Sequence, residues 1–420
     1  MSSALEKSIT IIARNAKKAS LLLQSVPEKQ VNKALLTMAS LLTSEKENLQ
    51  RANKKDLSAA RKKGLSSAMI DRLTLSDKTI GSMVKGLKEV AKISSPVGTG
   101  YDERVRPNGL KISKIKVPIG VVGIIYESRP NVTVDAAAIC LKSQNAVILR
   151  GGSESFHSNK ALTALFKKAM TTAKLPAASV QIIPTIDRTA IDIMLKLDQF
   201  IDLVIPRGGE SLIRAVVEKS HIPVIKHYKG ICHVYIASSA NVTTAVSIAV
   251  NAKVQRPGVC NAMETLLLDD RMTLAKRKKI IDALLDNGVT LFGDPKSRQL
   301  SPKIKRATTD DWYEEYLDLR LAVRTVKNID EAIDHINTFG SHHTDAIVSG
   351  SKRDIAVFLQ QVDSSSVIIN ASTRFSDGGE YGMGCEIGIS TDKLHARGPM
   401  GVEDLTTYKW VVLGEGQIRN

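Results

Sequence analysis

Cysteine and aromatic residues are scarce in this chain of 420 residues, and each shortage excludes a class of protein. The 4 cysteines are widely spaced, at positions Cys140, Cys232, Cys260 and Cys385. They cannot form the dense disulfide framework of a small secreted protein, and no two of them have the spacing of metal ligands. Aromatic residues make up only 4% of the chain, too few to expect stacking platforms for single-stranded nucleic acid.

Long apolar runs are also missing, as is a basic segment followed by an apolar core near residue 1. No stretch approaches the length that spans a membrane, and Met1–Ser8 lacks the pattern of a secretory signal. Hydrophobic residues still make up 43% of the chain, enough for a large core, and the length suits two or three domains. We expect a cytoplasmic globular protein with free thiols and no membrane partner.

Acidic residues are outnumbered by basic ones, and the formal net charge is +16. A basic surface attracts anions, including nucleic acid, phosphates and carboxylates. The densest basic run, Lys276–Lys279, falls in a segment with helical apolar spacing, which favours a solvated helix face over a nucleic-acid patch. We therefore expect phosphorylated or acidic small molecules as ligands, with a non-enzymatic nucleic-acid-binding protein as the alternative.

Apolar periodicity changes along the chain. The first 95 or so residues have helical spacing, and Leu110–Val117 then alternates apolar and basic residues, as a strand with one wet face does. From Gly120 to Ile236, buried strands alternate with helices, which predicts a parallel sheet covered on both faces. The same rhythm from Val242 to Asn370 indicates a second α/β unit, and Thr407–Leu413 alternates like an edge strand.

Two strand-to-helix turns are rich in glycine. One reads Arg150-Gly151-Gly152-Ser153-Glu154, and the other reads Arg207-Gly208-Gly209 and is followed by Glu210-Ser211. Paired glycines let backbone N–H groups approach phosphate oxygens, and the arginines can supply cationic donors. The alternative is that both are tight turns with capping serines. A G-x-G-x-x-G fingerprint is absent, so a conventional Rossmann site is not predicted.

Two further residues are candidates for catalysis. Asn131 follows a buried strand, where its amide can donate to an oxyanion, although a helix N-cap for Val132 onward is the alternative. Cys260 follows a Pro-Gly break and precedes the apolar run Leu266–Leu268. Its thiolate would be a strong nucleophile, whereas most free cysteines are small buried residues. The pair His342-His343 has no third ligand nearby, so we predict no metal site.

In combination and in this order, several windows resemble the aldehyde dehydrogenase superfamily, and the resemblance covers essentially the whole chain. The windows are Ala52–Ala60, Val117–Asn131, Ile205–Gly209, Asn251–Leu268 and His395–Leu405. The resemblance implies two parallel-sheet α/β domains plus a small β oligomerisation flap. It divides the chain into an NADP-binding domain (1–106 and 118–230, with a return segment near 366–390), a catalytic domain (231–365) and the flap (107–117 and 391–420).

Site residues follow from the resemblance by position. Cys260 matches the nucleophile and Asn131 the oxyanion-hole amide. Glu315 matches the carboxylate that holds the nicotinamide ribose, Arg150–Glu154 replaces the segment beside the adenosine ribose, and Arg207–Gly209 matches a loop beside the cofactor NADP(H). The cations proposed to bind the substrate's phosphate or α-carboxylate are Arg129, Lys253, Arg256 and Arg397. Each of these four can equally be an ordinary surface cation.

One departure from the superfamily pattern narrows the set of reactions that this chain is expected to catalyse. Hydrolytic members carry a glutamate base in the segment that matches Pro223–Val234, and this chain has no carboxylate there. An enzyme that reduces its thioester should exclude water rather than activate it. The resemblance therefore implies NADPH-dependent reduction of gamma-glutamyl phosphate to glutamate-5-semialdehyde through a Cys260 thioester, the second step of proline biosynthesis from glutamate. A coenzyme-A-acylating aldehyde dehydrogenase, which also lacks the base, is the alternative.

The resemblance also implies partners. The strand pair Leu110–Val117 and Tyr408–Leu413 is similar to the superfamily's oligomerisation flap, and an exposed edge strand invites pairing with another subunit. We expect a homo-oligomer, a dimer or higher. The kinase that makes the unstable acyl phosphate, glutamate kinase, is expected to make transient contact.

Overall fold

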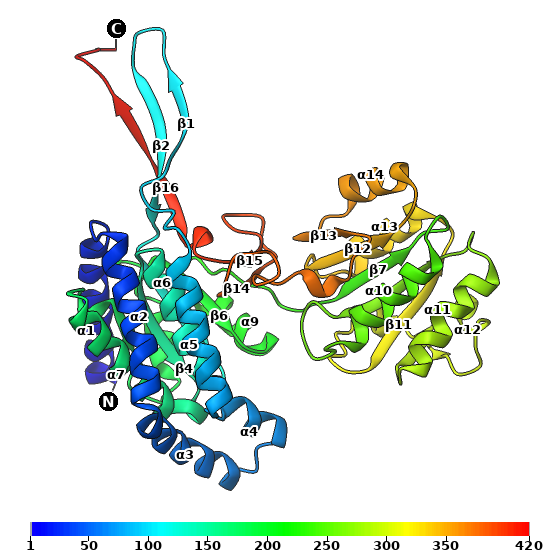
Figure 1. Cartoon of the computed structure of the whole chain (residues 1–420), viewed down its shortest axis with the longest axis horizontal. Helices are drawn as coiled ribbons and strands as arrows, with labels where there is room; N and C mark the ends of the chain where they lie inside the picture. The colour runs from blue at the N-terminus through cyan, green and yellow to red at the C-terminus, as the bar shows by residue number, and fades with distance from the viewer. Residues whose placement is uncertain (1, 420) are drawn as a thin grey trace. The chain divides into compact units, whose positions relative to one another are not determined.

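The structure is a computed structural model that describes residues 2–419 (Figure 1). The chain forms two compact units, each built from separate stretches of sequence. The first unit holds the chain up to Lys226, residues 382–388 and the chain from Met400 onward. The second unit holds residues 227–381 and 389–399. Within residues 2–419, no helix combines the length and the apolar character that a membrane crossing requires.

The first unit begins with helices, as the apolar spacing predicts. They are α1 (Ser2–Leu23), α2 (Glu28–Ser44), α3 (Lys46–Lys62), α4 (Ser67–Leu73) and α5 (Asp77–Lys92). Pro27 precedes α2, and the hydroxyls of Ser66 and Ser76 accept hydrogen bonds from main-chain N–H groups at the starts of α4 and α5. These are favourable starts, because a capping oxygen satisfies an N–H group that has no partner inside the helix.

A parallel sheet of four strands forms the centre of the first unit, in the order β5-β4-β3-β6. The strands are β3 (Val121–Tyr126), β4 (Ala146–Gly151), β5 (Val180–Ile182) and β6 (Leu203–Arg207). The helices that alternate with them are α6 (Pro130–Lys142), α7 (Phe156–Thr172), α8 (Thr189–Met194) and α9 (Glu210–Lys219). Every residue of β3 is buried, which means that the sheet is covered on both faces, as predicted.

An antiparallel sheet of three strands also belongs to the first unit, in the order β1-β2-β16. Its strands are β1 (Gly100–Val105), β2 (Lys111–Pro118) and β16 (Thr406–Leu413). Figure 1 shows that these strands project away from the helices of their unit. The predicted edge strand is confirmed, since β16 pairs only with β2 among the described strands. The predicted flap omits β1, whose polar sequence lacks a clear alternation.

The second unit contains an all-parallel sheet of seven strands, in the order β10-β9-β11-β8-β7-β12-β13. The strands are β7 (Cys232–Ile236), β8 (Met263–Asp269), β9 (Thr290–Gly293), β10 (Lys305–Arg306), β11 (Arg320–Val326), β12 (Thr344–Val348) and β13 (Ser366–Ile369). The helices are α10 (Val242–Val254), α11 (Leu274–Asp286), α12 (Pro295–Arg298), α13 (Ile329–Phe339) and α14 (Lys352–Gln361). A two-stranded sheet, β14 (Gly388–Ser390) and β15 (Gly398–Met400), lies where the chain passes between units.

Two hydrophobic cores cover the two faces of the seven-stranded sheet. Val234 and Leu266 belong to one core, and their chain neighbours Tyr235 and Leu267 belong to the other. This alternation follows from the two-residue period of a strand. Two parallel-sheet α/β units thus agree with the predicted fold class.

The predicted domain boundaries need two corrections. Residues 366–381 lie in the second unit, because β13 pairs in parallel with β12, whereas we expected a return to the first domain. Residues 391–399 also lie in the second unit rather than with the three-stranded sheet. A short apolar strand such as Val367–Ile369 can join the edge of either sheet, so its pattern does not identify its partner.

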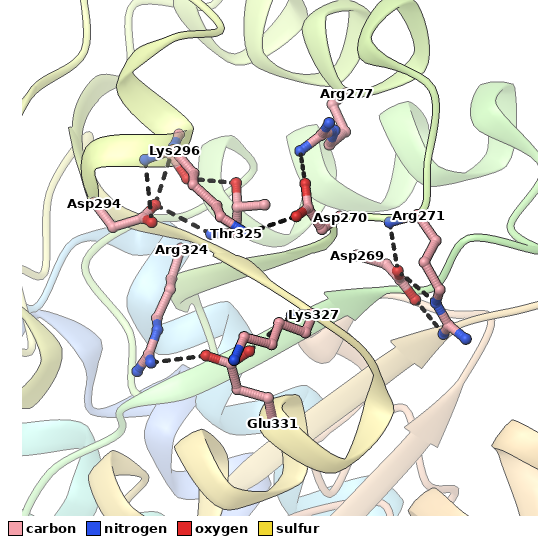
Figure 2. Close-up of polar contacts among 11 residues, drawn as sticks. Asp269, Asp270, Arg271, Arg277, Asp294, Lys296, Arg324, Thr325, Lys327 and Glu331 are labelled. Atoms are coloured by element: carbon pink, nitrogen blue, oxygen red, sulfur yellow. Dashed lines mark hydrogen bonds and ion pairs between the residues drawn. The ribbon is translucent and has the colours of Figure 1, made fainter.

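The carboxyl ends of β8 and β11 are occupied by ion pairs between neighbouring side chains (Figure 2). Asp270 accepts from Arg277 at 2.8 Å and from Lys296 at 2.6 Å. The other pairs are Asp269–Arg271 at 2.6 Å and Arg324–Glu331 at 3.0 Å. Arg277 belongs to the basic run Lys276–Lys279 on α11, and the three lysines of that run are exposed, as a solvated helix face requires.

Candidate active site

Cys260 lies in the loop between α10 and β8, so it precedes its strand at the amino edge of the seven-stranded sheet. The side chain is partly exposed. The main-chain carbonyl oxygen of Cys260 accepts a hydrogen bond from the buried thiol of Cys232 at 3.1 Å. The neighbouring Asn261 is buried and donates from Nδ2 to the carbonyl of Ser376 at 2.9 Å. The loop is therefore anchored at Cys260 itself and at the residue that follows it.

Gly230, just before β7, packs directly on the main chain of Cys260. A Cβ atom at Gly230 would collide with the carbonyl group and Cα of Cys260, so only glycine permits this approach. The N–H group of Gly230 donates to Oε1 of Glu315 at 2.9 Å. Glu315 precedes β11, and Gly230 therefore contacts both Glu315 and the Cys260 loop. The structure thus brings these two predicted residues to the same edge of one sheet.

Lys253 is the residue whose predicted role the structure corrects most clearly. Its Nζ lies 2.5 Å from Oε2 of Glu264, and both side chains have 0% exposure. The other oxygen of Glu264 accepts from the N–H group of Leu317 at 3.2 Å. Burial raises the pKa of Glu264, and the charge of Lys253 opposes that shift. A buried, paired ammonium group does not reach substrate; it ties α10 to β8 on both sides of the Cys260 loop.

The other proposed substrate cations differ in their surroundings. Arg256 is exposed within the Cys260 loop, and Arg129 is exposed at the N-cap position of α6 in the first unit. Arg397 is held by Asp363, with Nη1 at 2.9 Å from Oδ1, so its charge is already compensated inside the second unit. Among these four residues, Arg256 is nearest to Cys260 in the sequence.

The segment 223–231 before β7 contains His227 and no carboxylate. His227 lies 3.0 Å from the carbonyl oxygen of Ile389 through Nδ1, and its ring centroid is 5.7 Å from that of His343. Nδ1 of His343 lies 3.7 Å from the Cys232 sulfur. Within residues 2–419, no three His, Cys, Asp or Glu side chains are grouped so that they could hold a metal ion.

In the first unit, Asn131 is the second residue of α6 and not its N-cap, since the helix begins at Pro130 after Arg129. Nδ2 of Asn131 donates to Oδ2 of Asp135 at 3.0 Å. Burial raises the pKa of Asp135 to about 6, against the lowering effects of Asn131 and of the Arg207 charge. The contact with Asp135 orients the amide, which carries two N–H donors.

The two glycine turns follow β4 and β6 at the carboxyl edge of the four-stranded sheet. Arg150 is buried, and its Nη2 donates to the carbonyls of Ile186 and Asp187 at 3.1 and 3.3 Å. This corrects the prediction of a cation presented to a ligand, because the guanidinium group instead holds the main chain of a neighbouring loop. Burial lowers the pKa of Arg150.

The second glycine turn is more open. Gly209 precedes α9, and a Cβ atom there would meet nothing within 4 Å, whereas at Gly208 it would meet the carboxylate of Glu127. The N–H group of Gly209 donates to that carboxylate at 3.1 Å. In the first turn, Ser153 donates to Glu154 at 2.8 Å. The N–H group of Gly209 at the start of the ten-residue helix α9 thus contacts a carboxylate, as expected where main-chain N–H groups favour negative charge.

Known proteins are similar to this chain over most of its length. Residues 1–318 match the model of the aldehyde dehydrogenase family. The chain belongs to the aldehyde dehydrogenase family. Among its relatives in that family, gamma-glutamyl phosphate reductase of Geobacter metallireducens is 52% identical over 98% of this chain and 98% of its own length.

Solved structures of the aldehyde dehydrogenase family also match. Gamma-glutamyl phosphate reductase of Thermotoga maritima is 41% identical with a TM-score of 0.96, covering 98% of this chain and 100% of that one. An acetylating aldehyde dehydrogenase of Geobacillus thermoglucosidasius is 16% identical with a TM-score of 0.69, covering 99% and 98% of the two chains. That second likeness shows a shared fold and nothing more. The predicted resemblance to the superfamily is confirmed.

Proposed function

We propose that this protein reduces gamma-glutamyl phosphate to glutamate-5-semialdehyde and phosphate, with NADPH as the reductant, as the second step of proline biosynthesis. The observation that carries the proposal is full-length similarity to relatives named for this reaction, at 52% identity in one case. A partly exposed Cys260 in an anchored loop is the local feature that the reaction needs. An acetylating aldehyde dehydrogenase matches at 16% identity, which shows the shared fold and does not support the coenzyme-A-acylating alternative.

In the proposed mechanism, the Cys260 thiolate attacks the acyl carbon of the substrate. The C–S bond forms, the acyl C–O bond breaks, and both electrons of that bond leave with phosphate, so that a thioester remains on Cys260. The Asn131 amide and the Cys260 main-chain N–H are proposed to donate to the oxyanion of the tetrahedral intermediate. Asp135 orients the amide through its 3.0 Å contact with Asn131.

The thioester must survive until it is reduced. His227 and its neighbours before β7 offer no carboxylate to activate water, which favours reduction over hydrolysis. When bound, the nicotinamide cofactor supplies the hydride for that reduction. We propose that Glu315 holds its nicotinamide ribose, and that Ser153, Glu154 and the Gly208-Gly209 turn hold the adenosine half. The supporting features are the hydrogen bond from Gly230 to Glu315 and the open start of α9.

We also propose a cytoplasmic homo-oligomer, a dimer or higher, that contacts glutamate kinase transiently. The exposed edge strand β16 supports the first part, because an edge strand offers unpaired main-chain groups to another chain. Trp410 on that strand is 50% exposed, which is unusual for a large aromatic side chain.

The test is NADP+ reduction in phosphate buffer, with glutamate-5-semialdehyde as substrate. Phosphate-dependent reduction by the wild type, lost in Cys260→Ala and kept in Cys385→Ala, would support the proposal. Cys385 is a partly exposed cysteine of the other unit and serves as the matched control. Activity that requires coenzyme A would move the assignment to the acylating class, and an active Cys260→Ala protein would exclude the covalent mechanism.

A further inference from the structure

A short turn that the sequence did not single out lies against the Cys260 loop. It is the 3₁₀ turn η4 (Thr373–Phe375), which follows β13. Two hydrogen bonds attach it to opposite ends of the loop. Nε of Arg374 donates to Oε1 of Gln255 at 2.9 Å, and Nδ2 of Asn261 donates to the carbonyl of Ser376 at 2.9 Å. The turn and the residue after it therefore contact both ends of the segment from Gln255 to Asn261, which carries Cys260.

The turn is well ordered by its own contacts. The hydroxyl of Ser372 accepts from the N–H group of Arg374 at 3.3 Å, and the hydroxyl of Ser376 donates to that of Ser366 on β13 at 3.1 Å. Ser372, Thr373 and Ser376 are buried, whereas Arg374 is partly exposed. A guanidinium group held at Nε by Gln255 is oriented, and its two Nη groups point beyond that contact.

The charges around the turn favour an anion. Burial is the main cause that lowers the pKa of Arg374, and the charge of Arg256 acts in the same direction. Asp377 and the sulfur of Cys260 act in the opposite direction. Two arginines that repel each other beside a nucleophile are stabilised by a ligand that carries negative charge.

We infer that Arg374, together with Arg256, binds the phosphoryl group of the acyl phosphate beside Cys260. This inference rests on the proposed function. The phosphoryl group is bonded through one oxygen to the carbon that the sulfur attacks, whereas the α-carboxylate lies at the far end of the glutamyl chain. Cations that flank the Cys260 loop are therefore better placed for phosphate. As the acyl C–O bond breaks, negative charge grows on the departing phosphate, and a fork of two N–H donors stabilises it.

The experiment measures initial rates of NADP+ reduction while phosphate and glutamate-5-semialdehyde are varied separately. In Arg374→Gln, the KM for phosphate should rise about 10- to 100-fold, as expected for a lost hydrogen bond to a charged group, with the KM for the semialdehyde unchanged. Arg374→Lys should restore part of the loss, because it keeps the charge without the fork. Arg353→Gln, an exposed arginine on α14, is the matched control and should behave as wild type.

A second readout does not depend on turnover. Inorganic phosphate should slow the alkylation of Cys260 by iodoacetamide in the wild type and in Arg353→Gln, but not in Arg374→Gln. An unchanged KM for phosphate, or protection that persists in Arg374→Gln, would overturn the inference. A raised KM for the semialdehyde alone would assign Arg374 to the α-carboxylate instead. If the wild type shows no phosphate-dependent turnover, the proposed function fails, while the alkylation result still decides the phosphate site.

Discussion

The two parallel sheets of this protein carry their candidate functional residues at opposite edges. In the first unit, Asn131, the Ser153-Glu154 pair and Gly209 follow strands, at the carboxyl edge. In the second unit, Cys260 and Glu315 precede strands, at the amino edge. Ligands of open α/β sheets generally bind at the carboxyl edge. Under the proposed function, the first sheet follows this rule and the second departs from it.

The contacts at each edge explain the difference. At the carboxyl ends of β8 and β11, Asp269, Asp270 and Glu331 form ion pairs with nearby cations of the same unit (Figure 2). At the amino edge of this sheet, Gly230 lets the segment before β7 approach the Cys260 loop closely. The buried Lys253–Glu264 pair joins the two elements that flank that loop, α10 and β8. The two edges of the second sheet therefore differ in their side-chain contacts, and not only in strand direction.

The largest effect should come from breaking the buried pair at the amino edge of the second sheet. Lys253→Met leaves the Glu264 carboxyl group buried without its cation, which typically costs about 3–5 kcal/mol of unfolding free energy. Denaturant unfolding measures this loss. The double variant Lys253→Met with Glu264→Gln removes both charges and should recover most of the stability. A loss below about 1 kcal/mol in the single variant would contradict the supporting role.

The next effect concerns the carboxyl edge of the first sheet. If the Asn131 amide donates to the oxyanion, Asn131→Ala should lower turnover by about 100- to 1,000-fold while NADPH binding is kept. Steady-state kinetics and NADPH fluorescence measure the two properties. Asn131→Asp has a similar shape but lacks the donor, so it should be equally impaired. Near wild-type turnover in either variant would remove Asn131 from this role.

A smaller effect is a pH dependence of stability at the same edge. Burial raises the pKa of Asp135 from 3.8 to about 6 in the folded protein. The folded state therefore favours the protonated acid, and the associated stability is present below about pH 4 and is lost as the pH rises through 6. After discounting for partial solvent access, we expect a change of about 1–2 kcal/mol, measured as the difference between wild type and Asp135→Asn across that range. A pH-independent difference would mean that the carboxyl group titrates normally.

The smallest effect should come from the carboxyl edge of the second sheet. Lys296 is 48% exposed and pairs with Asp270, so Lys296→Ala should change the unfolding free energy by less than about 1 kcal/mol. Turnover should equal that of the wild type, because this edge is not part of the proposed site. A marked loss of turnover in Lys296→Ala would break the comparison between the two edges.

Much of the fold was predictable from local patterns. The alternation of buried runs and amphipathic segments predicted both parallel sheets, and β16 was recognised as an edge strand. The strand β1 was missed because its sequence, Gly100–Val105, is polar and mostly exposed. The strand rhythm up to Asn370 placed β13 with the second unit, where it pairs with the preceding strand β12, whereas the domain division implied by the resemblance assigned it to the first domain.

The candidate site was only partly predictable. Cys260 and Asn131 stand out through their sequence windows. The sequence offers Lys253 as a cation that could bind substrate, because no neighbouring residue indicates that the Glu264 carboxylate pairs with it in the fold. Arg374 was missed because it is far from Cys260 along the chain and is brought there by β13 and the bond to Gln255.

The sequence by itself determined the alternation of strands and helices, the family and the nucleophile candidate, because these depend on residue type and spacing along the chain. Only the tertiary structure decided which arginine and lysine side chains contact the Cys260 loop and which are buried in ion pairs. The physical reason is that a cation's role is set by the charges and the burial around it, and those come from segments distant in sequence.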